Sequence, residues 1–563
     1  MSHSSIDRFA AWTSALRVQD VPARVTAKAR LQLLSVLAAS YAGLGTAAGR
    51  TLLDVLRRRG AGGSTDVLFP PTGERMRTAE AVLAGAALGM TLDYDDYLWL
   101  GHTGHSAVWA SLCVAAQEGR TVAEARTAQV AANEVAGRLG GLVVVGPQNG
   151  QLWSHVHLGG AAVAAARLRG LDAERTADAL GIALYQPPFA LWPGFLGSES
   201  KILTAALPSW QALLAVDLAA AGMAGARDLV DHERGLGRFF AYAPAPHMLG
   251  GLGAAWVSDT LAYKLYPGCA YVDAAVDAAH EVLRQRAGGG PTAPLAAADV
   301  RAVRVRAGAM TAGMEALSAP HRARDAAAPL TPVEVNFSVA LSVAMTLCRG
   351  GLRAADFAET SLRAVSADVR ALAARTDVEH DLAMTLDLLD GLDRALALRR
   401  FVAALGPRAL WRAARRLQDD LSLGQALRPR LGAGSVGAVA RALWTGVLGG
   451  GGRRKAHDGG TGGDAGPYDF GRAQLDVLEF RFSAAVEVEL QDGTVLQATQ
   501  RIPRAAPGWD AADTERLVHE KFLREAAPVL GEARARAALA AATDPAGDAR
   551  PASALLADLS ARE

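Results

Sequence analysis

Acidic and imidazole side chains gather in one short segment, LDYDDYLWLGHTGHS. Asp93, Asp96 and Tyr97 have the spacing i, i+3 and i+4, which on a helix places them on one face. His102 and His105 follow in a glycine-containing turn that can fold back over that face. Carboxylates and imidazoles held together can exchange protons near neutral pH, as general acid–base catalysis requires.

The same cluster has two other interpretations. An acidic helix end capped by histidines explains the pattern about as well as catalysis does. A metal site from Asp93, Asp96, His102 and His105 is a weaker hypothesis, because nothing in the spacing fixes a coordination geometry. We therefore expect no metal.

Two lysines point to an anion. Only five of the 58 basic residues are lysines, so a lysine inside an apolar segment suggests a need for a compact ammonium group. Lys201 follows a Gly-Ser turn at the start of an apolar helix, where a cation is favourable only beside an anion. Lys264 lies in YKLYPGCAYVD, where two predicted domains join and ligand clefts tend to form. The alternatives are chance, and a hinge with a surface lysine.

A histidine pair precedes an alanine-rich helix. His155 and His157 lie in WSHVHLGG, at or near a helix N-terminus, where backbone N–H groups favour an anion. Taken alone, such histidines are more often ordinary capping or core residues.

Composition excludes several classes of protein. The 563 residues are 50% hydrophobic, and 58 basic residues nearly balance 57 acidic ones, which argues against nucleic acid or a membrane as partner. Three scattered cysteines fit no zinc, iron–sulfur or disulfide framework. The N-terminus has no secretory pattern, and the apolar stretches fall short of about 18 residues. We expect a cytoplasmic protein.

The periodicity predicts mostly helices, then an α+β part. Expected helices cover 25–42, 78–97, 108–117, 122–139 and 160–168, with an extended segment at 66–69. Further along, we expect a strand at 299–306, a helix at 333–347, a hairpin around Asp492-Gly493 and a helical return at 510–541.

The segment from about 381 to 468 fits neither pattern. It starts with arginine-rich helical text and ends in GGGGRRKAHDGGTGGDAGP, which we interpret as a flexible linker. The glycines are not followed by a helix of the P-loop type. The basic helix could contact an acidic partner or a membrane surface, although such faces are more often simply solvated.

The ordered motifs resemble those of the MmgE/PrpD family, which includes 2-methylcitrate dehydratase and cis-aconitate decarboxylase. LDYDD followed by GHS is similar to the family's DFDDT…HPS, and the segments around Lys201 and Lys264 are similar to further motifs. TPVEVNFS resembles TP-x-E-A-K-F-S, and EKF resembles a C-terminal KF. The similarity runs through 6–380 and 474–540.

The resemblance implies a mainly α fold. A large helical domain would be built from both chain ends, 1–262 and 506–563, with a smaller α+β lid domain at 263–505 that carries the 381–468 insertion. The active site would lie between them, usually in a homodimer. The implied activity is that of a carbon–oxygen or carbon–carbon lyase acting on small carboxylic acids without a cofactor.

The resemblance also implies roles for particular residues. The catalytic group comprises Asp93, His105, His155, Lys201 and Lys264, although His157 fits the histidine before the alanine-rich helix as well as His155 does. The expected substrate-binding residues are Tyr97, His102, His157, Cys269 and Tyr271. In such a site a neutral histidine removes a proton next to a carboxylate, and an ammonium group stabilises the developing charge.

The departures from the family pattern are informative. Tyr97 replaces a threonine, the text after Lys201 lacks two arginines and a histidine, Asp273 replaces a histidine and Asn336 replaces a lysine. These changes lower the positive charge available for a tricarboxylate, while several tryptophans lie near the motifs. We expect a less anionic and more apolar substrate than methylcitrate.

Two other functions remain open at this point. One is a catalytically altered homologue that serves as a binding or assembly protein, which the lost basic residues and the insertion favour. The other is a metal-dependent hydrolase, which would need stoichiometric bound metal.

Overall fold

The computed structural model describes residues 4–60, 67–288, 290, 292–322, 325, 327–419 and 468–561. These residues form mainly helices with small sheets, so the predicted mainly α fold is confirmed. The glycine-rich linker predicted before residue 468 lies outside the described residues.

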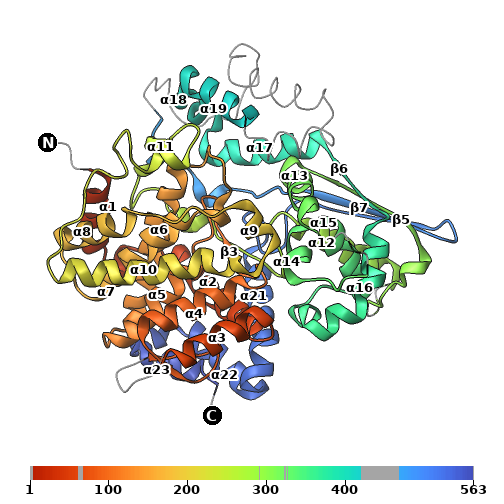
Figure 1. Cartoon of the computed structure of the whole chain (residues 1–563), viewed down its shortest axis with the longest axis horizontal. Coiled ribbons are helices and arrows are strands. Elements are labelled where there is room, and N and C mark those ends of the chain that lie inside the picture. The colour runs from red at the N-terminus through yellow and green to blue at the C-terminus, as the bar shows by residue number, and fades with distance from the viewer. Residues whose placement is uncertain are drawn as a thin grey trace.

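A compact group of helices forms the larger part of the molecule (Figure 1). Small residues let these helices approach closely: a Cβ on Gly85 would lie 2.1 Å from the ring of Trp109. The helices are α1 (Ser5–Ala15), α2 (Ala23–Gly43), α3 (Ala47–Arg58), α4 (Thr78–Met90), α5 (Gly104–Gln117), α6 (Val122–Leu142), α7 (Ser154–Leu168), α8 (Ala173–Leu184), α9 (Trp192–Gly197), α10 (Leu203–Ala220) and α11 (Leu236–Phe240).

The end of the chain returns to these helices. Figure 1 shows α21 (Ala511–Leu530), α22 (Glu532–Thr543) and α23 (Ala552–Asp558) beside α2 and α5. The rings of Tyr41 on α2 and Phe522 on α21 meet edge to face, 6.1 Å apart. The predicted helical return at 510–541 is therefore confirmed, with a break at Gly531, whose φ is 81°.

A four-stranded sheet organises the other part of the molecule. Its order is β6 (Thr376–His380), β5 (Val300–Ala307), β7 (Ala484–Leu490) and β8 (Val495–Gln500). Strand β6 runs parallel to β5 and the other pairs are antiparallel, with Val305 opposite Val486. The predicted strand at 299–306 and the hairpin are confirmed.

Helices pack around this sheet, and others follow it. They are α12 (Asp273–Arg286), α13 (Ala309–Ser318), α14 (Pro332–Phe337), α15 (Val339–Arg349), α16 (Glu359–Ala373), α17 (Leu382–Leu396), α18 (Leu398–Leu405) and α19 (Pro407–Asp419). The helix expected at 333–347 is broken at Ser338, whose side chain caps α15 by accepting a hydrogen bond from Leu341 N–H.

The helix expected at 78–97 is wrong in its second half. Helix α4 ends at Met90, and Asp96–Tyr97 forms a short strand, β3, that pairs with β4 (Ala262–Tyr263). Asp93 adopts the left-handed conformation with φ of 49°, which a helix does not allow. Long-range pairing with β4 outweighs the helical propensity of this segment. The extended segment near residue 66 is β1 (Val67–Leu68), paired with β2 (Arg75–Met76).

Among the residues that the structure describes, one helical stretch, Glu199–Ala220, is long and apolar enough to cross a bilayer, but 56% of its apolar window is buried in the protein. The sharply bent pair α2 and α3 passes the same test when taken together. Core helices of soluble proteins show the same property.

Candidate active site

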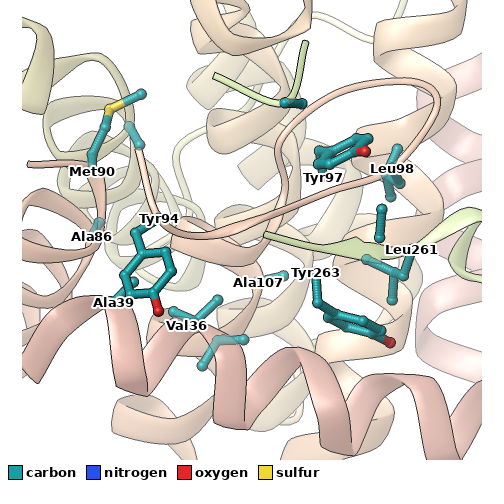
Figure 2. Close-up of a cluster of buried hydrophobic side chains, with 14 of the residues drawn as sticks. Val36, Ala39, Ala86, Met90, Tyr94, Tyr97, Leu98, Ala107, Leu261 and Tyr263 are labelled. Carbon is teal, nitrogen blue, oxygen red and sulfur yellow. The ribbon is translucent and has the colours of Figure 1, made fainter. Parts of the chain in front are cut away.

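The loop after α4 carries the acidic motif through the protein interior. In Figure 2 this loop passes from Met90 over α2, with the Tyr94 ring beside Val36, and continues to Tyr97 and Leu98. Asp93 is fully buried, and its left-handed backbone is a conformation that costs energy in a non-glycine residue. Such strain tends to occur at functional sites.

Asp93 binds the first of the two predicted lysines. Its Oδ2 accepts a hydrogen bond from Lys201 Nζ, and its Oδ1 accepts one from Gln151 Nε2. Lys201 lies on the short 3-10 helix Glu199–Ile202, directly before α10. Burial lowers the pKa of Lys201, and the charge of Asp93 opposes that shift.

Asp95 binds the second lysine and both histidines of the motif. Lys264 Nζ donates to Asp95 Oδ1 at 2.8 Å and to the backbone oxygen of Asp93 at 2.8 Å. Asp95 Oδ2 lies 3.0 Å from His102 Nδ1 and 2.9 Å from His105 Nε2. One buried carboxylate therefore joins an ammonium group and two imidazoles.

The charged groups in this cluster shift each other's pKa values. Burial would raise the pKa of Asp95, but Lys264, His105 and His102 outweigh burial and hold that pKa well below its usual range. Burial would lower the pKa of Lys264, but Asp95 and Asp93 raise it overall. The largest influence on His102 is burial, which lowers its pKa. An ionised Asp95–Lys264 pair thus lies beside a neutral His102.

Asp96 points into a different network, so the single acidic helix face predicted from the sequence is wrong. Gln32 Nε2 on α2 donates to Asp96 Oδ2 at 2.7 Å, and Gln32 Oε1 accepts from Asn133 and Gln129 on α6. Burial and the charge of Asp95 raise the pKa of Asp96 to about 7. Asp93 and Asp95 are the residues that contact the lysines.

The two histidines of α7 occupy different surroundings. His157 Nδ1 lies 3.0 Å from Ser106 Oγ, and its ring centroid is 6.1 Å from that of His105. Burial and the nearby histidines hold the pKa of His157 well below its usual range. The ring of His155 packs against Phe240 at 4.9 Å, and burial lowers its pKa to about 3. Of the two, His157 is the one beside the acid–imidazole cluster.

The remaining predicted residues line the same region. The ring of Tyr97 stacks on Phe480 at 5.6 Å and lies 5.8 Å from the His102 ring. Cys269 N–H donates to the backbone oxygen of Asn336 at 2.7 Å, and burial raises the pKa of its thiol to about 12. The Tyr271 ring packs edge-on against Phe482. These side chains are buried or nearly so.

A third lysine, Lys521, links the loop that carries Asp93 and Asp95 to the segment that carries Lys264. Lys521 Nζ on α21 donates to Ser35 Oγ at 2.8 Å, to the backbone oxygen of Tyr94 and to the backbone oxygen of Lys264 at 2.9 Å. The neighbouring Arg524 donates to Tyr94 Oη. Burial lowers the pKa of Lys521 to about 7. Helix α21 therefore fixes the backbone that carries Lys264.

A cavity of about 540 Å³ opens between the two parts of the molecule at Lys201. From the helical part it is lined by Thr46–Ala48, Thr91, Gly197–Glu199, Lys201 and Ile202. From the sheet part it is lined by Pro329–Val333, Phe357, Glu359, Leu362 and Arg363. Lys201 joins this cavity to Asp93.

This arrangement can bind an anion and move a proton. Two buried ammonium groups can stabilise charge on carboxylate oxygens, and imidazoles held by Asp95 can act as base or acid. Within the described part of the chain, no group of three or more His, Cys, Asp or Glu side chains is arranged to hold a metal ion.

Sequence reasoning missed Asp95, Gln151 and Lys521. Asp95 lies within the LDYDD motif, but no local pattern shows that the loop after α4 brings it to Lys264. Gln151 follows an Asn-Gly turn that gives no chemical clue. Lys521 appeared only within the EKF motif.

Comparison with known proteins agrees with these motifs. The MmgE/PrpD N-terminal domain matches residues 7–248, and the MmgE/PrpD C-terminal domain matches residues 266–395. No curated protein matches the chain. Membership of this family supports a lyase function of the dehydratase type in general. With both domains matched in order over most of its length, the chain belongs to the MmgE/PrpD family.

Proposed function

We propose that the protein is a cofactor-independent lyase that removes a proton next to the carboxylate of a small acid, one less anionic and more apolar than methylcitrate. The observation that carries this proposal is the pairing of two buried lysines with Asp93 and Asp95, together with the cavity that Lys201 lines. Such paired charges are expensive to bury, and they cluster where catalysis needs them.

The lysines and the histidines have different roles in the proposed reaction. Lys201 and Lys264 bind the substrate carboxylate and stabilise the charge that grows as the neighbouring proton leaves. His102, which is hydrogen-bonded to Asp95, or His105, whose Nε2 lies 2.9 Å from the same carboxylate, takes that proton. In a dehydratase reaction the carbon–carbon double bond then forms as the carbon–oxygen bond on the neighbouring carbon breaks and hydroxide, protonated to water, leaves. Comparing His105→Gln with His102→Gln identifies the base, because only its loss abolishes proton removal.

The lining of the cavity supports the apolar character of the substrate. Leucine, isoleucine, proline and phenylalanine side chains form much of its wall: Ile202, Pro329, Leu330, Pro332, Phe357 and Leu362. An alkyl chain placed there would leave water, at about 25 cal/mol per Å² of buried area.

Proton exchange tests the proposal directly. The purified protein is incubated in D₂O with hydroxy and unsaturated mono- and dicarboxylic acids, and deuterium uptake next to the carboxylate is followed by NMR. We expect uptake with at least one acid, and a loss of about 10²–10³-fold in Lys201→Met. The matched control is Lys28→Met, because Lys28 donates to the backbone of Asp259. An acid that binds without exchanging its protons would instead support a binding protein.

We also propose a homodimer that forms through the outer face of α10. Leu207, Trp210 and Leu214 are 45%, 37% and 45% exposed and form one stripe along that helix. Tyr185 and Leu191, in the segment after α8, add further exposed apolar surface.

Light scattering measures this directly. We expect Trp210→Glu combined with Leu214→Glu to convert a dimer into a folded monomer. Phe239→Glu, at an exposed phenylalanine on α11, should leave the dimer intact. A wild-type protein that is monomeric throughout would refute the dimer.

A further inference from the structure

The side chain of Asn336 on α14 is fully buried and makes no hydrogen bond to the residues that the structure describes. Neither its Nδ2 nor its Oδ1 has a partner among the described residues. Leaving a buried amide unpaired carries the full cost of removing that group from water, so native proteins rarely do so without a functional reason.

Asn336 lies between the cavity and the Asp93 loop. It follows Val333, which lines the cavity, by three residues on α14 and so shares that face of the helix. The next residue, Phe337, has its ring centroid 4.8 Å from Lys201 Nζ. On the other side, Gly268 approaches the Asn336 backbone and donates its N–H to the oxygen of Leu92, the residue before Asp93.

Two more buried polar groups in this region are also unpartnered. In the described part of the chain, Tyr97 Oη and Asp273 Oδ1 have no hydrogen-bond partner. The ring of Tyr97 stacks on Phe480, which stacks on Phe482, and Phe482 packs against Tyr271, two residues before Asp273. Asp273 is also within electrostatic range of both Tyr97 and Cys269. The Cys269 backbone in turn binds Asn336.

The surroundings of Asp273 favour its neutral form. Burial raises its pKa well above the usual range, and Asp277 and Asp95 add to the rise. Lys264 and Lys521 face it from the other elements and oppose the shift without cancelling it. A protonated carboxyl group, an amide and a phenol can all donate and accept hydrogen bonds, and none supplies a positive charge.

We propose that Asn336, Asp273 and Tyr97 form a neutral polar subsite that binds an uncharged group of the substrate, such as an amide, an ester carbonyl or a hydroxyl. The inference rests on the proposed function, in which Lys201 and Lys264 hold a single carboxylate. It narrows the substrate class to acids that carry one carboxylate at the lysines and a neutral polar group at the other end.

Paired ligands that differ in one group test this subsite. Isothermal titration compares succinate, glutarate and adipate with their half-amides, in wild type, Asn336→Leu and Asn336→Lys. We expect wild type to bind at least one half-amide about tenfold more tightly than its diacid. Asn336→Leu should lose that preference, and Asn336→Lys should reverse it in favour of the diacid.

Variants of Asp273 give a second, independent test of the subsite. Asp273→Asn keeps a neutral polar group and should retain the preference for the half-amide, whereas Asp273→Leu should lose it. Melting temperatures show whether each variant is folded, and the Asn variant keeps the test decisive if the Leu variant is not.

The outcomes separate the two proposals. The neutral subsite is overturned if diacid and half-amide bind equally well and Asn336→Leu changes neither affinity. If Lys201→Met abolishes binding of both ligands in that case, the proposed function still stands. A wild-type protein that binds none of the six ligands contradicts both.

Discussion

Asp95→Asn is expected to cost more stability than any other single change in the site, about 3–5 kcal/mol. Asp95 is the carboxylate that pairs with Lys264 and holds two histidines, all buried or nearly so. Without its charge the Lys264 ammonium is left with weakened compensation, and burial then lowers its pKa. Turnover should fall with it, because the ammonium and both imidazoles lose their common anchor.

The pH dependence of this loss has a definite sign. The folded-state pKa of Asp95 is depressed below the unfolded value of about 4, so its contribution to stability is complete above that pH. The contribution is lost as pH falls through the folded-state pKa. The gap in unfolding free energy between wild type and Asp95→Asn should therefore be constant near neutrality and narrow in acid.

The matched control is the double variant Asp95→Asn/Lys264→Met. Removing both charges leaves no unpaired ion, so the double variant should be more stable than Asp95→Asn while remaining inactive. Denaturant unfolding and the D₂O exchange assay measure the two properties. An Asp95→Asn protein as stable as wild type would contradict the role assigned to this carboxylate.

Asp93→Asn is expected to give the second large effect, a fall in kcat of about 10²–10⁴. Asparagine fits the left-handed backbone at φ of 49° and still reaches Gln151, so the change isolates the charge that faces Lys201. Without that charge, burial lowers the pKa of Lys201 further, and a neutral amine no longer stabilises a carboxylate.

Asp93→Ala separates charge from backbone strain. Alanine lacks the local hydrogen bonds that make the left-handed conformation tolerable, so it should lose about 1 kcal/mol more stability than Asp93→Asn. Both variants should show the same loss of kcat. If Asp93→Asn retains wild-type kcat while Asp93→Ala does not, Asp93 is a conformational residue and its charge has no part in the reaction.

Local patterns predicted most elements correctly, and long-range contacts explain the errors. The apolar periodicity identified α2, α6, α15 and the strands β5, β7 and β8, because burial on one face fixes such elements. The segment after Met90 was assigned as helix because alanine and acidic residues favour one. Its true conformation depends on pairing with β4, more than 160 residues away in sequence, which no local pattern reveals.

The same division holds for the site. The scarcity of lysine singled out Lys201 and Lys264, and the structure places both in buried ion pairs. The prediction that Asp96 lies beside Asp93 in the site depended on the predicted helix at 78–97, and it is wrong for the same reason. Asp95 takes that place because the irregular loop after α4 brings the Asp93 and Asp95 carboxylates to Lys201 and Lys264.

The hydrogen bonds that Lys521 donates to the backbone of Tyr94 and Lys264 determine when the site can form during protein synthesis. Asp93, Lys201, Lys264 and Asn336 all leave the ribosome before α21 does. Until α21 emerges, the backbone oxygens of Tyr94 and Lys264 lack the donor that bridges them. A growing chain therefore carries every proposed catalytic side chain well before it can hold them in working positions, and activity arrives only with the final helices.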